Sequence, residues 1–199
     1  KFNIFENGDF RNTLTSWTES TANTSSDLLT TVTSPTNVPI DSNAYKFVGD
    51  PESHKYVKQT LDLSGLAGDT FVVSGWAKGE SVPVVSGTDR RFGLMIGFIK
   101  ADGTAEYVAA NYNQDASDRQ YMSYVAKSPI AYDSVVVYCR YYDNVNTAYF
   151  DGIRLYKEEF GDSYTYDSDG NLISAVDLAK QNSAFEYSAA NDLTKATDP

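Results

Sequence analysis

Apolar and polar residues alternate in short segments through most of the chain, and residues typical of turns separate these segments. A period of two puts successive side chains on opposite faces of a β-strand, so we predict roughly eight or nine short strands. Long helical patterns are scarce, and the chain is therefore predicted to be all-β, as a sandwich or barrel. The clearest strand segments are residues 44–49, 56–64, 70–78, 90–100, 105–113, 120–127, 134–142 and 148–156.

The alternation also assigns side chains to the core or to the surface. The predicted core faces consist of Phe71 and Val73, of Phe92, Leu94, Ile96 and Phe98, and of Val135, Val137, Cys139 and Tyr141. On the opposite side, Gly93 and Gly97 would leave an open floor. The side chains predicted to share one concave sheet there are Trp76, Tyr138, Arg140 and Tyr142. These aromatic residues also fit a plain structural role, either in the core or in cross-strand pairs.

The charge of the chain narrows the range of partners. The formal net charge is -11 at pH 7, and such a surface repels phosphate backbones and anionic lipid heads. No apolar run approaches the ~20 residues that cross a bilayer. We therefore expect no nucleic-acid partner and no membrane insertion, and we expect the chain to be a monomer.

Side chains suited to catalysis are sparse. Cys139 is the only cysteine and is interpreted as a small buried hydrophobe, and the only histidine, His54, has no motif around it. No Ser-His-Asp pattern, zinc-type cluster or Gly-rich phosphate loop occurs. The aspartates lie mostly near turns, where nothing indicates the raised pKa that a glycosidase acid needs. The chain is therefore predicted not to be an enzyme.

The pattern changes after Tyr156, where a polar junction leads into a repeated segment. An offset of about 21 residues places Tyr166–Ala175 over Tyr187–Ala196. Tyrosine, leucine and alanine match in the two copies, and Gly170–Asn171 becomes Asn191–Asp192. Both pairs tolerate the positive φ of a tight turn. The tail is therefore predicted to contain two β-hairpins, the second of which is degenerate.

The first copy resembles the YD repeat of RHS-type bacterial surface and toxin proteins, whose pattern is Tyr-Asp-x-x-Gly-Asn-hydrophobic. The matching residues are Tyr166, Asp167, Gly170, Asn171 and Leu172. In that family many such hairpins coil into a large shell, and two copies cannot close one. The resemblance implies that an array starts here and continues past Pro199.

The front of the chain carries a second resemblance. The segments Asn7–Trp17 and Tyr149–Tyr156 are similar to the opening and closing motifs of carbohydrate-binding modules with the galactose-binding-like jelly roll. The resemblance implies a jelly-roll module over residues 1–156, a junction over 157–163 and the start of a YD-repeat array over 164–199.

This second resemblance also implies a structural calcium ion near the two motifs, held by oxygen ligands. Asp151 stands at the position of the family's closing-strand aspartate, and Asp9 with the backbone around Asn7 and Gly8 would help to bind the ion. Arg11 stands where the family usually has glutamate, which removes a ligand and adds a positive charge. The alternative is that Asp151 caps a turn or pairs with Arg11.

Carbohydrate is the partner that the second resemblance implies. Aromatic planes cover the C–H face of a sugar while polar groups bind its hydroxyls. The candidate binding residues are Trp76, Tyr138, Arg140 and Tyr142 on the sheet face, and Tyr112 beside Tyr121 at a loop-end site. The choice between sheet face and loop end stays open.

We thus expect a non-catalytic carbohydrate-binding module of a bacterial RHS/YD-repeat surface protein, extracellular or associated with the cell wall. Two alternatives remain open, because jelly rolls also serve as plain spacers. One is a structural cap or spacer of the repeat shell with no ligand of its own. The other is a module that adheres to a protein through an exposed apolar patch.

Overall fold

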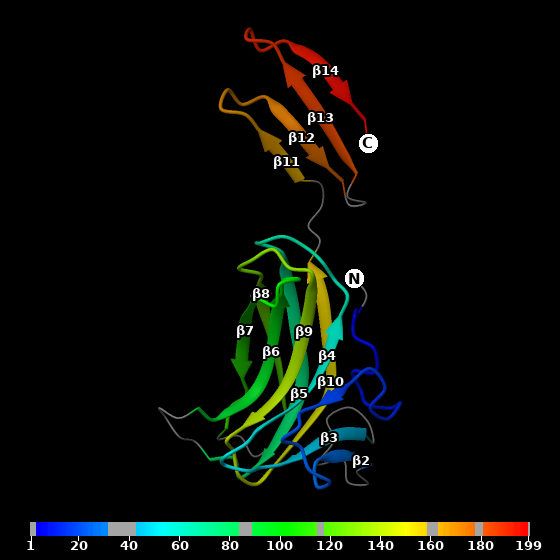
Figure 1. The fold of residues 1–199 in the computed structure, drawn as a ribbon, viewed down its shortest axis with the longest axis vertical. Coiled ribbons are helices and arrows are strands. Elements are labelled where there is room, and N and C mark those ends of the chain that lie inside the picture. Colours follow the sequence, from blue (N-terminus) through cyan, green and yellow to red (C-terminus); the bar gives the residue numbers. More distant parts are fainter. Residues whose placement is uncertain are drawn as a thin grey trace. The chain divides into compact units, whose positions relative to one another are not determined.

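The computed structural model describes residues 3–31, 43–83, 89–114, 118–158, 163–177 and 181–198. The chain divides into two compact units, Lys1–Lys157 and Glu158–Pro199. Throughout the described ranges the regular elements are strands, which confirms the prediction of an all-β chain (Figure 1). Over these same ranges, no helix has the length and apolar character that crossing a membrane requires.

The first unit contains two five-stranded sheets. The first sheet has the strand order Thr18–Glu19 (β1), His54–Leu61 (β4), Ser134–Tyr142 (β9), Arg91–Ile99 (β6) and Ala105–Asn111 (β7). The second sheet has the order Leu28–Thr31 (β2), Asn43–Val48 (β3), Thr147–Glu158 (β10), Thr70–Glu80 (β5) and Gln120–Lys127 (β8). Most sequence neighbours therefore lie in different sheets, and β6–β7 and β2–β3 are the only hairpins formed by consecutive strands among the pairings described for this unit.

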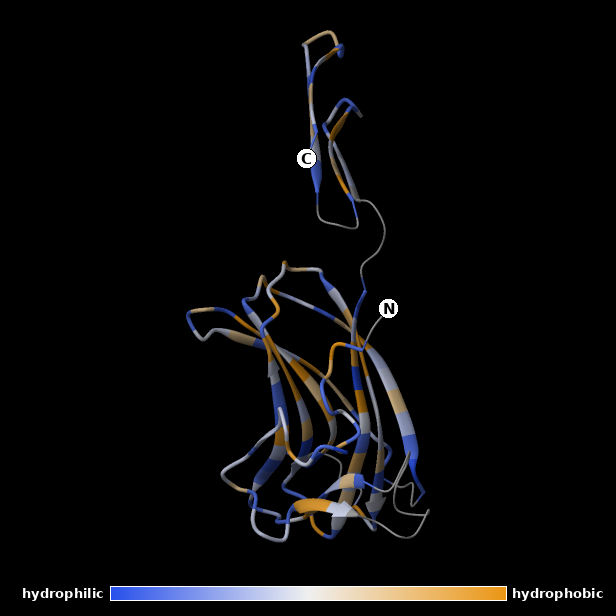
Figure 2. Cartoon of the chain, turned by 90° about the vertical axis from the view of Figure 1, so that its right-hand side faces the viewer, coloured by the Kyte–Doolittle hydropathy of each residue, from blue (hydrophilic) through white to orange (hydrophobic). Residues whose placement is uncertain are grey.

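Apolar side chains from both sheets meet in one core between them. All of the core-face residues predicted from the alternation are fully buried, including Phe71, Leu94 and Val137. Figure 2 shows hydrophobic and hydrophilic positions alternating along these strands. The sandwich prediction is confirmed, because the two sheets enclose one apolar core between them.

The opening motif forms a loop that is held together by hydrogen bonds of the Asn7 side chain. Asn7 has a φ of 50°, and its Nδ2 donates to the carbonyl oxygens of Thr13 at 2.9 Å and Thr15 at 3.1 Å. Its Oδ1 accepts from the amide of Asn12 at 2.9 Å. A side-chain amide can close a loop in this way because it both donates and accepts.

The same motif joins the sandwich through Gly8 and Trp17. The amide of Ile153 on β10 donates to the carbonyl of Gly8 at 2.8 Å, and a Cβ on Gly8 would lie 2.0 Å from the Ile153 carbonyl oxygen. Trp17 stacks on Phe5 and Phe10, with ring centroids 5.4 and 4.9 Å away. Its Nε1 donates to the Asn7 carbonyl at 2.9 Å. The tryptophan therefore covers one side of the core and closes the loop.

A buried ion pair links the two sheets at one end of the sandwich. Lys55 on β4 donates from Nζ to Asp27 Oδ2 at 2.8 Å and to the carbonyl of Val48 on β3 at 2.7 Å. Asp27 also accepts from the amides of Val48 and Thr24, each at 2.7 Å. The Lys55 and Asp27 side chains are 3% and 0% exposed. Each charge thus has several partners in place of water, as burial demands.

The second unit is a single antiparallel sheet in chain order. Its strands are Ser163–Tyr166 (β11), Leu172–Val176 (β12), Asn182–Tyr187 (β13) and Leu193–Thr197 (β14). A register shift occurs directly before Tyr166 and again directly before Tyr187. The two strands of the predicted repeat therefore carry the same irregularity at equivalent positions.

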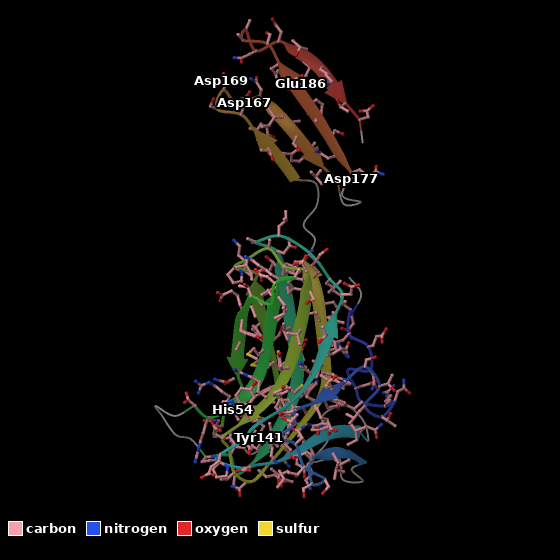
Figure 3. All side chains as sticks on the ribbon, in the orientation of Figure 1. His54, Tyr141, Asp167, Asp169, Asp177 and Glu186 are labelled. Atoms are coloured by element: carbon pink, nitrogen blue, oxygen red, sulfur yellow. The ribbon has the colours of Figure 1, made fainter. Side chains whose placement is uncertain are left out.

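Asp167 organises the turn between β11 and β12 (Figure 3). Its Oδ1 accepts from the amides of Asp169 at 3.0 Å and Asn171 at 2.8 Å, and Oδ2 accepts from Asn171 Nδ2 at 3.0 Å. Gly170 has a φ of +87°, which a residue with a side chain rarely adopts.

The turn between β13 and β14 repeats this arrangement with different residues. Ser188 Oγ accepts from the amides of Ala190 and Asp192 at 3.2 Å, and Asn191 takes the positive φ, 64°. Asn171 Nδ2 donates to Asn191 Oδ1 at 3.0 Å, which joins the two turns. The geometry accounts for the Gly-to-Asn change, since asparagine tolerates the left-handed conformation better than most residues.

Candidate functional site

A row of aromatic rings crosses the outer face of the first sheet, and we call it the aromatic belt. The belt consists of His54, Tyr142, Tyr56, Tyr138 and Tyr107. Successive ring centroids lie 4.6, 6.5, 5.2 and 6.3 Å apart. The strands that carry the rings, β4, β9 and β7, belong to one sheet with β6 between the last two (Figure 1). The belt is therefore a continuous aromatic surface.

Strand register explains why these rings gather. On β4 and β9, His54 lies opposite Tyr142, and Lys58 lies opposite Tyr138. On β7, Tyr107 lies opposite Gly97 of β6. Directly opposed residues share a face and touch, so the pairing aligns rings that are far apart in the sequence.

Two cations and an amide lie among the rings. Lys58 Nζ is 5.9 and 5.8 Å from the ring centroids of Tyr56 and Tyr138, within the range of a cation–π contact. Arg140 is only 6% exposed. It donates to Asn111 Oδ1 at 3.1 Å and to the Met95 sulfur at 3.7 Å, and its carbon Cζ lies 5.8 Å from the ring of Tyr142.

Burial shifts the pKa values of two belt tyrosines and of Arg140. It raises the pKa of Tyr138 and of Tyr142 above the ordinary value. Burial also lowers the pKa of Arg140, but guanidinium remains charged because its ordinary pKa is above ~12. At neutral pH the site thus offers neutral phenol groups, which donate and accept, beside cationic donors.

Three of the predicted sheet-face residues, Tyr138, Arg140 and Tyr142, do lie together on this face. The prediction that Trp76 shares their sheet is wrong, because β5 belongs to the second sheet. Trp76 pairs instead with Tyr121 of β8, at a centroid distance of 5.2 Å.

The predicted accessibility of Tyr112 is also wrong. This residue is 4% exposed and packs against Phe92 and Phe150 at centroid distances of 5.2 and 5.9 Å. Its hydroxyl is buried without a hydrogen-bond partner among the described residues. Tyr112 therefore belongs to the core and does not flank a loop-end site with Tyr121.

The glycines of β6 do not leave the open floor predicted for them. A Cβ on Gly97 would lie 2.6 Å from the ring of Tyr107, and a Cβ on Gly93 would lie 2.9 Å from Asn111 Oδ1. Side chains from β7 occupy the space, so the glycines allow Tyr107 and Asn111 to lie flat on the sheet.

Sequence reasoning did not select several residues of this face. They are His54, Tyr56, Lys58, Tyr107 and Asn111. A signal for them existed, because Tyr56 and Lys58 alternate with the buried Val57 and Gln59. The sequence alone did not show that β4 pairs with β9 and that β7 pairs with β6.

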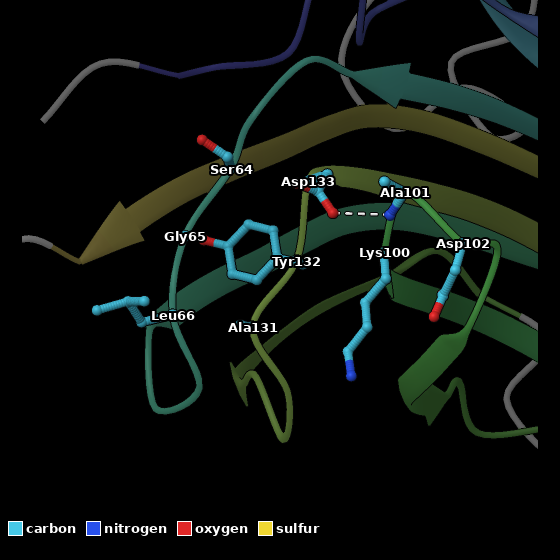
Figure 4. A pocket seen from close by; sticks show the side chains of 9 residues that line it. All are labelled: Ser64, Gly65, Leu66, Lys100, Ala101, Asp102, Ala131, Tyr132 and Asp133. Carbon is cyan, nitrogen blue, oxygen red and sulfur yellow. Dashed lines mark hydrogen bonds between the residues drawn. The ribbon is translucent and has the colours of Figure 1, made fainter.

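A pocket of about 570 Å³ lies at the loop end of the sandwich (Figure 4). Its aromatic wall, Tyr132, is 3% exposed and donates its hydroxyl to Asp69 at 2.8 Å. Asp133 accepts from the amide of Ala101 at 2.7 Å. Tyr132 and Asp133 thus use these groups in hydrogen bonds within the loops. Lys100 and Asp102 also line the pocket.

A second cavity, of about 670 Å³, adjoins the buried ion pair. Its polar lining is likewise engaged within the protein. Tyr45 donates its hydroxyl to Glu19, Asn23 Nδ2 donates to Tyr45 and to the carbonyl of Tyr56 at 3.0 Å each, and Asp27 holds Lys55. The cavity therefore offers few unused hydrogen-bonding groups.

The predicted calcium ligands lie in different surroundings. Asp9 pairs with Arg11 at 3.2 Å beside a cavity that Gly8 and Ile153 also line. Asp151 is buried on β10. No group of three or more acidic, histidine or cysteine side chains suited to a metal occurs in the described residues. Backbone carbonyls would have to supply most of the roughly six to eight oxygens that calcium takes.

The positively charged Arg11 guanidinium also lies beside the Asp9 carboxylate, which a calcium ion would need as a ligand. The described donor set thus fits calcium poorly, and calcium binding stays a prediction. Unfolding temperatures measured with calcium and with a chelator test it, since a ligand that binds the folded state raises the midpoint.

No family model and no curated protein matches this chain. Solved structures share its fold. The enzymatically active domain of tailspike protein 4 from bacteriophage CBA120 superposes with a TM-score of 0.58 and 18% identity, covering 78% of this chain and 21% of that one. This chain thus spans about a fifth of the tailspike domain's length.

Two carbohydrate-binding modules superpose over nearly their whole length. A family 16 module gives a TM-score of 0.51 with 14% identity and covers 77% of this chain and 99% of that one. The CBM22-1 xylan-binding domain of Xyn10C from Paenibacillus barcinonensis gives 0.53 with 13% identity and covers 77% and 93%. The first unit therefore has the sandwich fold of carbohydrate-binding modules. Because the tailspike domain is enzymatically active, the absence of catalysis in this chain stays a prediction.

Proposed function

We propose that the first unit binds carbohydrate through the aromatic belt. The observation that carries the proposal is the continuous row of rings from His54 to Tyr107, with donors between them. Tyr107 is 49% exposed, so its ring is open to a ligand. Aromatic planes pack against the C–H faces of sugars, and nearby polar groups bind the hydroxyls.

The fold supports the same proposal. Two of the structures that superpose over nearly their whole length are carbohydrate-binding modules, one of them described as xylan-binding. Fold similarity alone does not assign function, which is why the belt carries the argument. We further propose that the module acts outside the cell or in the cell wall of a bacterium, attached to YD repeats that begin in the second unit. The equivalent turns at Asp167 and Ser188 support the repeat.

The test uses two tyrosines with nearly equal exposure on opposite sheets. Tyr107 is 49% exposed and Tyr121 is 51% exposed. Glycan arrays probed with the wild-type chain should identify a bound sugar. Tyr107→Ala should then weaken binding about tenfold, which corresponds to ~1.4 kcal/mol. Tyr121→Ala should leave it unchanged.

Three other results would contradict this proposal. Loss of binding in Tyr121→Ala alone would move the site to the Trp76–Tyr121 pair. Binding that is unchanged in both variants would move the site to a loop end. A folded chain that binds no glycan at all would favour the structural cap or spacer. Circular dichroism of each variant verifies the fold.

A further inference from the structure

We propose that the aromatic belt selects acidic glycans, whose sugar carboxylates pair with Lys58 and Arg140. This inference rests on the proposed function and specifies its ligand class. The reason is the charge of the belt's surroundings, which is opposite to that of the whole chain.

The outer-face positions of the first sheet carry basic residues and no acidic ones. The strand register assigns to this face Thr18 of β1; His54, Tyr56, Lys58 and Thr60 of β4; Ser134, Val136, Tyr138, Arg140 and Tyr142 of β9; Arg91, Gly93, Met95, Gly97 and Ile99 of β6; and Ala105, Tyr107, Ala109 and Asn111 of β7. The structure describes all of these positions, and none is Asp or Glu. None of the 27 acidic residues of the chain therefore stands at these positions.

Two acidic residues contact basic residues at one end of the belt. Asp143 is 3.1 Å from His54 Nε2, and Asp89 lies 3.8 Å from Arg91. Within the described chain, Lys58 and Arg140 have no carboxylate partner. Lys58 is the more exposed of the two, and Arg140 is buried.

Arg140 is the more informative of the two. Its Nε is buried and has no hydrogen-bond partner among the described residues. A neutral amide and a thioether sulfur are the acceptors near its terminal nitrogens. Burying a cation without a counter-ion costs stability, and a guanidinium binds a carboxylate through paired N–H groups. A sugar carboxylate would provide the missing negative charge.

The aromatic rings explain why the anion should belong to a sugar. A compact anion such as phosphate would leave the rings without a role. A uronic acid combines a C–H face for the rings with a carboxylate for the cations. The belt and its charges thus suit one ligand.

The test compares polygalacturonate with its fully methyl-esterified form, using the full chain in affinity electrophoresis and calorimetry. The two polymers differ in charge but share one sugar backbone. We expect the acid form to bind about tenfold or more tightly than the ester, and this preference should decline as salt rises.

Two lysine variants and one arginine variant test which cation binds the sugar carboxylate. Lys58→Gln should reduce the preference for the acid form several-fold, and Lys127→Gln, which removes an exposed lysine from β8 of the second sheet, should not. Arg140→Gln should reduce it further, provided that circular dichroism shows an unchanged fold.

Equal binding of acid and ester would overturn the inference and leave the proposed function intact. So would binding of neutral glycans only, or an equal loss in Lys58→Gln and Lys127→Gln. Failure to bind any glycan, acidic or neutral, would instead remove the proposed function itself.

Discussion

Replacing Asp27 with alanine is expected to lower the free energy of unfolding of the first unit by about 3–5 kcal/mol. The substitution leaves the Lys55 ammonium buried with the Val48 carbonyl as its remaining partner. It also removes the acceptor of the Thr24 and Val48 amides. An uncompensated buried charge explains most of the loss, since desolvation is no longer offset by the pair.

Urea unfolding followed by tryptophan fluorescence measures this effect, because both tryptophans, Trp17 and Trp76, belong to the first unit. Asp102→Ala is the control, since Asp102 is an exposed turn residue in the same unit. It should shift the midpoint far less. The double variant Asp27→Leu with Lys55→Met should lose less than Asp27→Ala, because no unpaired charge stays buried. A double variant as unstable as the single one would show that the backbone amides, and not the charge, dominate.

Replacing Trp17 with alanine is expected to cost about 3–5 kcal/mol of unfolding free energy. The indole is 7% exposed and packs between Phe5 and Phe10. Its removal opens a cavity between these two rings. Trp17→Phe should cost less, because it keeps an aromatic ring and loses the Nε1 hydrogen bond to Asn7, which is worth about 1 kcal/mol.

Trp76→Ala provides the matched control for this second prediction. Trp76 is the other tryptophan, but it is half-buried on the outer face of the second sheet. Trp76→Ala should lower the free energy of unfolding clearly less than Trp17→Ala does, as measured by urea unfolding followed by circular dichroism. Equal losses would mean that the opening loop contributes little to the core.

The alternation of apolar and polar residues predicted which side chains are buried. The face on which a side chain lies depends only on its position along its own strand. Val137, Leu94 and Phe71 each point inward because the period of two requires it. The same rule, counted on from Tyr107 and Asn111, would also have placed Tyr112 in the core. The error came from assigning Tyr112 to a loop-end site although it lies within the predicted strand 105–113.

Sheet membership could not be predicted in the same way. Trp76 and Tyr138 have the same outward orientation relative to their strands, but β5 and β9 belong to different sheets. Non-consecutive pairings such as β4–β9 and β6–β9 depend on contacts across the whole unit. The belt depends on these pairings, because they bring β4, β9, β6 and β7 into one sheet. The tail was more predictable, because its turns at Asp167 and Ser188 use local hydrogen bonds.

Mapping the bound glycan on the protein by NMR tests the central claim most directly. The best ligand from the array would be titrated into the isotope-labelled full chain, and changes in backbone amide shifts would be followed. We predict the largest changes on β4, β6, β7 and β9, around Tyr56, Tyr107, Tyr138 and Tyr142. Changes confined to the loop-end pocket around Tyr132, or to Trp76 and Tyr121, would contradict the account.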